Sequence, residues 1–246
     1  MKLLLMCDGV VGCAIASWLV DTYPEDVGLL VTISNNNLTE SALKNNIPTM
    51  IYQSESQILA FEQGACFTLG ILAWWPKIIS TALIAKCESG VINTHPSLLP
   101  HNRGKHYNFW AIVEGSPFGV SLHFVDEGID TGDVIAQQEI EYGWQDTGKS
   151  LYEKASEAMI ELFRLTYPQI RSGNFKRRPQ PTDTGSFHYA SEIHSASKIN
   201  LDEKYTARDL INLIRARTFE GKPACRFEED GIEYEITSRI KRMNHE

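Results

Sequence analysis

Short apolar runs alternate with helix-like stretches along the first part of the chain. Apolar runs bounded by turn signals are typical of strands buried on both faces. Here they occupy residues 2–6, 27–34, 47–53, 65–72 and 90–95. A glycine turn leads from the first run into a helix that reaches about Val20, and 54–64 has a serine at its start and a glycine at its end, as a helix would. This alternation predicts an α/β fold with an open, Rossmann-like, mostly parallel sheet and flanking helices.

The next part of the chain adds two strands whose apolar and polar residues alternate, at 119–125 and 133–142. A helix over 108–115 precedes them and ends at a glycine. A longer helix follows, capped by Asp146 or Thr147. Its apolar stripe comprises Leu151, Ala155, Ala158, Leu162 and Leu165.

The composition changes at residues 171–185, where Gly, Pro and basic residues show no periodicity and indicate a linker. Beyond it, 206–218 predicts a helix, and 225–236 predicts a hairpin with an Asp-Gly turn. We therefore expect an N-terminal catalytic domain over 1–175 and a small C-terminal α+β domain over 186–246.

Charge and composition narrow the class of protein. The 246 residues are 43% hydrophobic and carry a net charge of −8, which disfavours nucleic acid as a partner because phosphate binding needs positive charge. No apolar run reaches the roughly 18 residues of a membrane helix, and the N-terminus is better explained by a strand and glycine turn than by a signal peptide. Five cysteines without a CxxC pair indicate reduced thiols, a cytoplasmic location and no structural zinc.

Candidate chemistry lies where the fifth predicted strand ends. Asn93 and His95 are two residues apart, so their side chains project from one face of that strand. Ligands of open α/β sheets bind at this edge. Taken alone, the pair also fits a strand terminator and a surface histidine. The irregular segment 96–104 that follows favours a functional loop.

Two further loops have competing interpretations. The acidic loop 126–133 suits a solvated turn or a cation site, although its spacing is not that of an EF-hand. Alternatively, one of its carboxylates lies against His95 and orients the imidazole for acid–base chemistry. The "DGVVG" segment lacks the GxGxxG fingerprint, which favours a tight strand–helix turn over a dinucleotide site.

Two motifs carry a family resemblance. "NTHPSLLPHNRG" and "GVSLHFVDEGIDTGDVIAQQEI" resemble the two motifs of the 10-formyltetrahydrofolate-dependent formyltransferases, over roughly residues 1–170 and more loosely in the tail. The resemblance implies that Asn93, His95 and Asp130 are catalytic. We expect no metal, because the sequence has neither paired zinc ligands nor EF-hand spacing. The resemblance also implies that 10-formyltetrahydrofolate lies against two loops, at Leu72, Trp74, Trp75, Lys77, Val125, Asp126, Gly128 and Asp130. The two tryptophans are equally well explained as core aromatics.

The implied chemistry accounts for these residue types. An amine attacks the formyl carbon and creates an oxyanion, which an Asn93 amide and a protonated His95 can stabilise. Asp130 can keep His95 charged and relay the proton that the amine loses.

The tail indicates which amine is formylated. "INLIRARTFEGKPACRFEEDGIEYEI" resembles the sugar N-formyltransferases, which implies a nucleotide-linked dideoxy amino sugar (dTDP or GDP) as acceptor, a role in O-antigen or lipopolysaccharide biosynthesis, and a homodimer formed through this region. Basic and aromatic residues of "NRGKHYNFW" suit a pyrophosphate and a base, although Phe109 and Trp110 also suit a core. The expected acceptor contacts are Asp8, Gly9, Arg103, Lys105, His106, Tyr107, Asn108, Phe109 and Trp110.

Three other functions remain open at this point. They are formylation of methionyl-tRNA or another small amine, hydrolysis of formyltetrahydrofolate, and binding without catalysis. The short acidic tail argues against tRNA. The intact set of Asn93, His95 and Asp130 argues against a protein that only binds.

Overall fold

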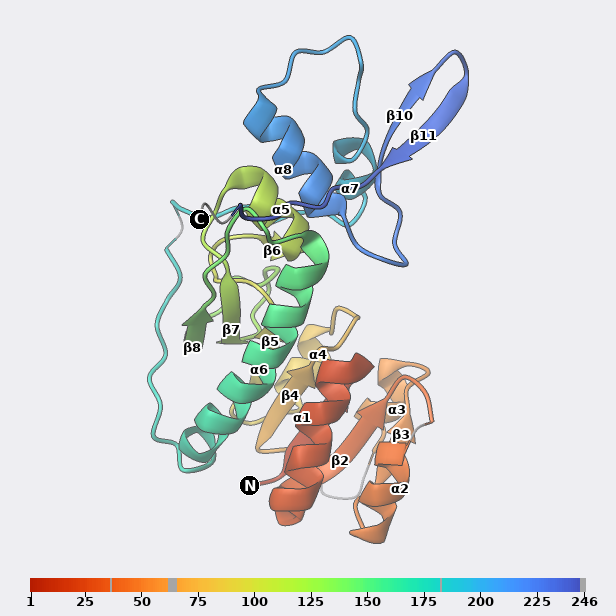
Figure 1. Ribbon diagram of the computed structural model, residues 1–246. Helices are drawn as coiled ribbons and strands as arrows, with labels where there is room; N and C mark the ends of the chain where they lie inside the picture. Colours follow the sequence, from red (N-terminus) through yellow and green to blue (C-terminus); the bar gives the residue numbers. More distant parts are fainter. Residues whose placement is uncertain (36, 62–65, 182, 244–246) are drawn as a thin grey trace. The chain divides into compact units, whose positions relative to one another are not determined.

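The computed structural model describes residues 1–243 except 36, 62–65 and 182 (Figure 1). The elements, in chain order, are β1 (Leu3–Cys7), α1 (Gly9–Thr22), η1 (Pro24–Asp26), β2 (Val27–Thr32), α2 (Asn37–Lys44), β3 (Thr49–Ile51), α3 (Glu55–Leu59), β4 (Leu69–Ala73), α4 (Thr81–Ala85), β5 (Val91–His95), β6 (Arg103–Gly104), α5 (Tyr107–Glu114), β7 (Gly119–Phe124), β8 (Val134–Glu139), α6 (Gly148–Arg171), β9 (Phe187–His188), α7 (Glu192–Ala196), α8 (Ala207–Arg217), β10 (Cys225–Glu229) and β11 (Ile232–Ile236). The expected end of the helix predicted over 54–64, at Gly64, lies outside the described residues.

The central sheet has seven strands in the order β3-β2-β1-β4-β5-β7-β8. Strands β1 to β5 pair in parallel, whereas β7 runs antiparallel to β5. This confirms the predicted open, mostly parallel α/β sheet. The chain turns from β3 at one edge back to β4 beside β1, so β1 and β4 flank the topological switch point where ligands bind in such sheets.

Helices cover both faces of β1. Leu4 and Met6 belong to a buried cluster with Ile58 of α3 and Leu83 of α4. On the opposite face, α1 approaches so closely that a Cβ added to Gly12 would lie 2.2 Å from the Ala73 carbonyl oxygen. Every residue of β1 is buried. This explains why β1 is an uninterrupted apolar run rather than an alternating one.

The chain divides into two compact units. The first comprises Met1–His95, Ser121–Gln137 and Met159–Gln180, and the second comprises Pro96–Val120, Gln138–Ala158 and Pro181–Glu246. This differs from the expected division at residues 175 and 186. Helix α5 packs against α8 within the second unit, so the tail shares a core with segments from the middle of the chain.

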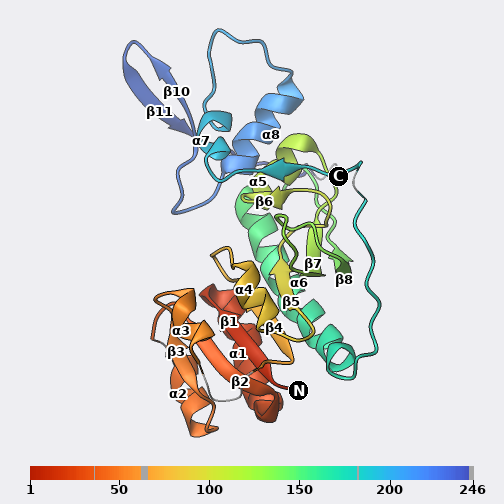
Figure 2. The same ribbon diagram turned by 180° about the vertical axis from the view of Figure 1, so that it is seen from behind.

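The tail itself has the predicted elements. Thr206 caps α8, its hydroxyl accepting a hydrogen bond from the Asp209 N–H at 3.1 Å. Strands β10 and β11 pair antiparallel, and Asp230 and Gly231 between them both have positive φ, as a two-residue hairpin turn requires. Figure 2 shows this hairpin from the side opposite to Figure 1.

The predicted linker is bound to the sheet. Arg178 and Val134 exchange two backbone hydrogen bonds of 2.8 and 2.9 Å, and the Arg177 guanidinium lies 3.4 Å from the centre of the Phe124 ring. Sequence periodicity gave no signal for this segment because its partners are distant in sequence. Within the described residues, no helix combines the length and apolarity needed to span a membrane.

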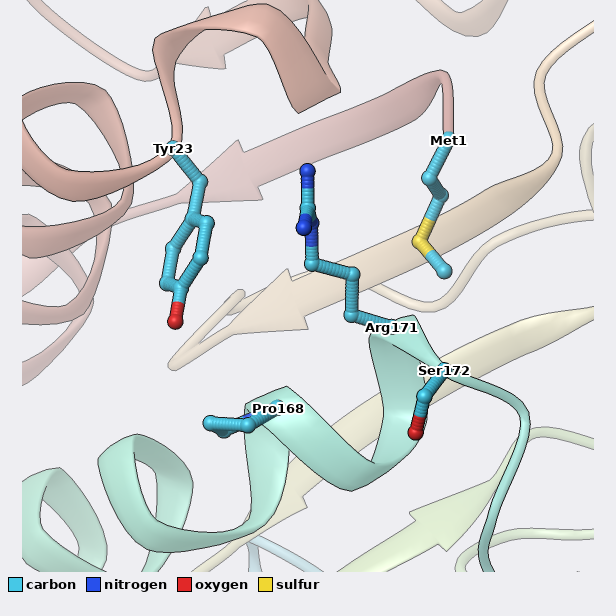
Figure 3. A pocket seen from close by; sticks show the side chains of 5 residues that line it. All are labelled: Met1, Tyr23, Pro168, Arg171 and Ser172. Carbon is cyan, nitrogen blue, oxygen red and sulfur yellow. The ribbon is translucent and has the colours of Figure 1, made fainter.

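A cavity of about 230 Å³ lies where α6 ends, in the first unit (Figure 3). Its lining residues are Met1, Tyr23, Pro168, Arg171 and Ser172. Beside it, Arg171 forms an ion pair of 2.6 Å with the buried Asp26 carboxylate, and the Arg171 guanidinium lies over the Tyr23 ring. None of the predicted site residues lines this cavity. We therefore interpret this cavity as part of the packing around the end of α6, and not as a ligand site.

Candidate active site

Strands β5 and β7 bring four polar side chains together at the carboxyl end of β5. Asn93 pairs with His123 and His95 pairs with Ser121 in the antiparallel register. Directly opposed residues project from the same face of a sheet. His95, Ser121 and His123 are buried, and Asn93 is half-buried. Alternation along both strands therefore creates a polar patch on a largely apolar sheet.

Asp130 completes this cluster from the loop after β7. Its Oδ2 lies 3.4 Å from His95 Nδ1, and its Oδ1 lies 3.4 Å from Asn93 Nδ2 and 3.5 Å from His123 Nε2. The carboxylate thus faces all three side chains. The structure brings together Asn93, His95 and Asp130, as the motif resemblance implies, and adds His123.

A tight turn sets the direction in which the Asp130 side chain points. Asp130 has a φ of 55°, in the left-handed region that L-residues seldom adopt. Upstream in the turn, Asp126 Oδ1 accepts hydrogen bonds from the Gly128 N–H at 3.1 Å and the Thr131 hydroxyl at 2.6 Å. The loop is therefore held from within by a side chain that mimics a backbone turn.

Hydrogen bonds fix the proton positions on the rings. His123 Nδ1 lies 2.8 Å from the Phe124 carbonyl oxygen, which only accepts, so Nδ1 carries the hydrogen. In the neutral ring, His123 Nε2 then accepts from the Asn93 amide at 3.3 Å. His95 directs Nδ1 at a carboxylate, which favours a hydrogen on that nitrogen as well. Separations of 3.3–3.5 Å are long for hydrogen bonds, and such contacts commonly tighten when substrate binds.

The expected cofactor contacts after β4 separate into two groups. Leu72 and Trp75 belong to the buried core cluster, and Trp75 packs edge-to-face on Tyr52 with ring centres 5.1 Å apart. Their side chains lie in the core, which leaves their backbone for the expected ligand contact. Trp74 is half-buried with a φ of 56°, and its N–H donates to the Thr94 hydroxyl at 2.8 Å; Lys77 is exposed.

The other first-unit contacts lie in two turns. Val125 packs against the core cluster, while Asp126 and Gly128 are exposed in the acidic loop. Asp8 and Gly9 follow β1, where the Asp8 N–H donates to the Ala73 carbonyl at 3.2 Å and Gly9 has a φ of 63°. The glycine segment is the tight strand–helix turn that the sequence favours.

The expected acceptor contacts in the second unit include several structural side chains. Phe109 is only 2% exposed, and Trp110 stacks on the His188 ring with centres 3.7 Å apart. The Asn108 amide donates to the Gly148 carbonyl at 2.7 Å. Tyr107 stacks on Phe118, and burial raises the pKa of its phenol well above the usual range.

The basic residues of this loop have polar groups that are available to a ligand. Lys105 is exposed, and the buried Arg103 Nε has no hydrogen-bond partner within the part of the chain that the structure describes. His106 adopts a left-handed conformation before α5, and burial lowers the pKa of its imidazole. Arg103 and Lys105 are therefore the members of the loop whose chemistry is best suited to an anion.

Two residues of the site, His123 and Gln180, are not indicated by the motifs. His123 lies in the alternating segment 119–125, but its position opposite Asn93 depends on strand pairing. Gln180 lies in the predicted linker, and its Nε2 donates to the Asp130 and Gly132 carbonyls. A polar residue on the buried face of a predicted strand was an available signal for His123. We find no local signal for Gln180.

Comparison with known proteins identifies the class to which this fold and site belong. The profile of the Formyl transferase family matches residues 32–165, and that of the N-formyltransferase dimerization C-terminal domain matches residues 192–242. The chain belongs to the formyl transferase family, which confirms the resemblance carried by the two motifs.

Two curated relatives differ in their acceptors. The chain is 35% identical over 147 residues to a methionyl-tRNA formyltransferase of Thermodesulfovibrio yellowstonii, covering 59% of this chain and 46% of the relative. It is 28% identical over 129 residues to a dTDP-4-amino-4,6-dideoxyglucose formyltransferase of Mycobacterium bovis, covering 52% and 55%. The chain thus spans about half the length of the curated relatives it matches.

Solved structures share the fold over nearly the whole chain. A sugar N-formyltransferase from a Shewanella species superposes with a TM-score of 0.80 at 22% identity, covering 99% of both chains. An N-formyltransferase from Helicobacter canadensis, in complex with folinic acid and dTDP-3-aminofucose, gives a TM-score of 0.72 at 20% identity, covering 94% of this chain and 85% of the other. Both similarities establish the fold.

Proposed function

We propose that this protein transfers a formyl group from 10-formyltetrahydrofolate to the amine of a nucleotide-linked amino sugar. The observation that carries the proposal is the convergence of Asn93, His95 and Asp130 at the end of β5. An amide donor and an imidazole that both contact one carboxylate are the groups needed to stabilise an oxyanion and to move a proton.

The reaction proceeds by addition and elimination. The acceptor nitrogen forms a bond to the formyl carbon, and the carbonyl electron pair moves onto oxygen. His95 donates a hydrogen bond to that oxyanion, and Asn93 turns one of its two amide hydrogens to it from the long contacts with His123 and Asp130. Asp130 stabilises the charged imidazole and accepts the proton lost by the amine, directly or through water. When the intermediate collapses, the bond to N10 of the folate breaks and that nitrogen takes up a proton.

Family membership and the geometry of the switch point support the folate donor. Trp74 and Lys77 follow β4, and Asp126 and Gly128 lie in the loop that carries Asp130. We assign these four residues to the folate, with Leu72, Trp75 and Val125 contributing backbone and core support. The Helicobacter canadensis homologue was crystallised with folinic acid, a formylated folate.

The tail favours an amino sugar as acceptor. Residues 192–242 match a domain that is named for N-formyltransferases, and one curated relative acts on a dTDP-linked dideoxy amino sugar. We assign Arg103 and Lys105 to the pyrophosphate of the acceptor. The nucleotide we expect is dTDP, with GDP as the alternative.

Methionyl-tRNA is the second candidate acceptor. The Thermodesulfovibrio yellowstonii relative favours it because it has the higher identity. The net charge of −8 disfavours it, since tRNA binding depends on neutralising phosphates.

The test is one panel of acceptors incubated with 10-formyltetrahydrofolate. It contains dTDP-, GDP- and UDP-linked amino sugars and initiator methionyl-tRNA, and formylation is detected by mass spectrometry. We expect the formyl mass gain on a nucleotide sugar and none on tRNA. His95→Ala is the matched control, and water alone as acceptor tests the hydrolase alternative. Formylation of tRNA with none of any nucleotide sugar would assign the protein to the second candidate.

A further inference from the structure

Gln180 holds the backbone that carries Asp130. One side-chain nitrogen, Nε2, donates hydrogen bonds to the Asp130 carbonyl at 2.9 Å and to the Gly132 carbonyl at 2.8 Å. Both hydrogens of the amide are therefore used on two carbonyls of one turn. Because both partners are acceptors, the orientation of the amide follows from its contacts.

The turn needs such a restraint. Asp130 has a φ of 55°, which is unfavourable for a residue with a Cβ atom. At Gly132, an added Cβ would lie 2.0 Å from the Phe124 carbonyl oxygen, so the backbone is also pressed against β7 there. The Gln180 amide spans the residue between these two positions. It thereby fixes the direction in which the Asp130 side chain leaves the turn.

Gln180 is itself anchored. The backbone of Arg178, two residues earlier, is paired with Val134 by hydrogen bonds in both directions. This strand-like pairing fixes the backbone next to Gln180 and so holds Gln180 beside the turn. The restraint on Asp130 therefore runs from Val134 of β8 through the consecutive residues 178–180.

We propose that Gln180 is a positioning residue that sets the Asp130 carboxylate against Asn93 and His95. This inference rests on the proposed function, because it assumes that Asp130 takes part in the reaction. Misplacement of a reacting group by about 1 Å can cost on the order of 10²-fold in rate. Loss of the two hydrogen bonds therefore lowers the rate of the chemical step and leaves affinity for the acceptor unchanged.

The environment of the Gln180 amide oxygen allows this side chain to be replaced by an apolar one. Oε1 is buried and has no hydrogen-bond partner among the residues that the structure describes. Replacing the amide by an apolar group of similar shape removes this unpaired oxygen together with the two donated hydrogen bonds. The two effects oppose one another in the free energy of unfolding. Gln180→Met is therefore expected to fold.

The experiment compares Gln180→Met with Gln138→Met, both in the full chain. Gln138 is a half-buried glutamine of β8, so it matches Gln180 in type and burial. Successive strand residues point to opposite faces, so its side chain leaves β8 on the face opposite to that of Gln137, which contacts Ser121 and Arg178. We expect Gln180→Met to lower kcat by roughly tenfold to a hundredfold, with KM for the acceptor within about twofold. Gln138→Met should change kcat by less than about threefold, because the contacts of Gln180 with the Asp130 turn remain.

A double variant separates positioning from general structural support. If Gln180 acts through Asp130, then Gln180→Met adds no further loss in an Asp130→Ala background. Equal losses in both backgrounds, or an unchanged kcat in Gln180→Met while Asp130→Ala is impaired, would overturn the proposal. An unimpaired Asp130→Ala would instead overturn the role of Asp130 in the proposed function. Faster hydrogen exchange at residues 128–132 in Gln180→Met gives an independent readout of the turn, and unchanged exchange would also contradict the inference.

Discussion

Asn93 and His123 occupy opposed positions on the antiparallel strands β5 and β7, and the Asn93 amide nitrogen lies 3.3 Å from His123 Nε2. His123 also faces Asp130, while its other ring nitrogen is bound to the Phe124 carbonyl. The ring is thus fixed at one end by the backbone and touches two proposed catalytic residues at the other.

This position predicts that His123 supports catalysis. His123→Asn places an amide near the former Nδ1, which preserves the bond to Phe124, and removes Nε2. We expect kcat to fall roughly tenfold to a hundredfold because Asn93 and Asp130 lose a shared partner. Steady-state kinetics with the acceptor identified by the panel provide the measurement. His123→Gln, which retains a polar group nearer to the Nε2 position, should be less impaired. Equal activity of both variants and the unmodified protein would remove His123 from the site.

The three residues at the centre of the proposed mechanism should each be indispensable for a fast reaction. We expect Asn93→Ala, His95→Ala and Asp130→Ala to lower kcat by about 10² or more, since loss of one oxyanion donor typically costs 10²–10³. Circular dichroism and thermal unfolding serve as controls for the fold. A variant with nearly full activity would show that its residue takes no part in the chemical step.

His95, His123 and Asp130 form a set of side chains that suits a transition metal. Ligand atoms of His95, His123 and Asp130 lie within 4.8 Å of one another, and zinc accepts nitrogen and carboxylate ligands at about 2.0–2.2 Å. In the proposed mechanism His95 stabilises the oxyanion and Asp130 accepts a proton, so a metal bound to them would block both roles. We expect chelation with EDTA to leave activity intact and micromolar Zn²⁺ to inhibit, reversibly on adding EDTA, with weaker inhibition of the residual activity of His123→Asn. Activity lost on chelation and restored by metal would contradict this prediction.

Stability at low pH should depend on Asp26. Burial acts to raise the pKa of this carboxyl, but hydrogen bonds from Arg171 and Tyr167 outweigh it and hold the pKa below its usual value. A depressed folded-state pKa gives stability that is complete above the ordinary aspartate pKa of about 4 and is lost as pH falls through the folded value. Urea unfolding between pH 7 and pH 3 should show this loss in the unmodified protein and a smaller one in Asp26→Asn. An identical pH dependence in both proteins would show that Asp26 does not contribute.

The tail hairpin should mediate self-association. Ile232 and Tyr234 on β11 are 55% and 43% exposed, and residues 192–242 match a dimerization domain. Exposed apolar side chains on a short hairpin need a partner surface. We expect a homodimer in sedimentation at tens of micromolar and a shift towards monomer in Ile232→Glu. Glu233→Gln, a change between the two apolar positions, should leave the assembly intact. A monomeric unmodified protein would exclude the dimer, and a dimeric Ile232→Glu would place the interface elsewhere.

Local pattern in the sequence determined most of the sheet. Buried parallel strands must be apolar on both faces, so β1, β2, β4 and β5 were visible as runs. The hairpin turn was visible because few residue pairs other than Asn-Gly or Asp-Gly adopt positive φ readily. Asn93 and His95 were assigned to one face by the period of the strand. Asp130 was assigned by family resemblance and not by spacing.

Tertiary structure alone decided which distant residues meet. The contact of His123 with Asn93 follows from the β5–β7 register, and the bonds from Gln180 to the Asp130 turn follow from the pairing of Arg178 with Val134. It also decided that Trp75 is a core residue while its neighbour Trp74 is half-buried. Side-chain period and turn chemistry act over a few residues and can be read along the chain. Pairing register and burial depend on all the elements that pack together, and no local stretch of sequence records them.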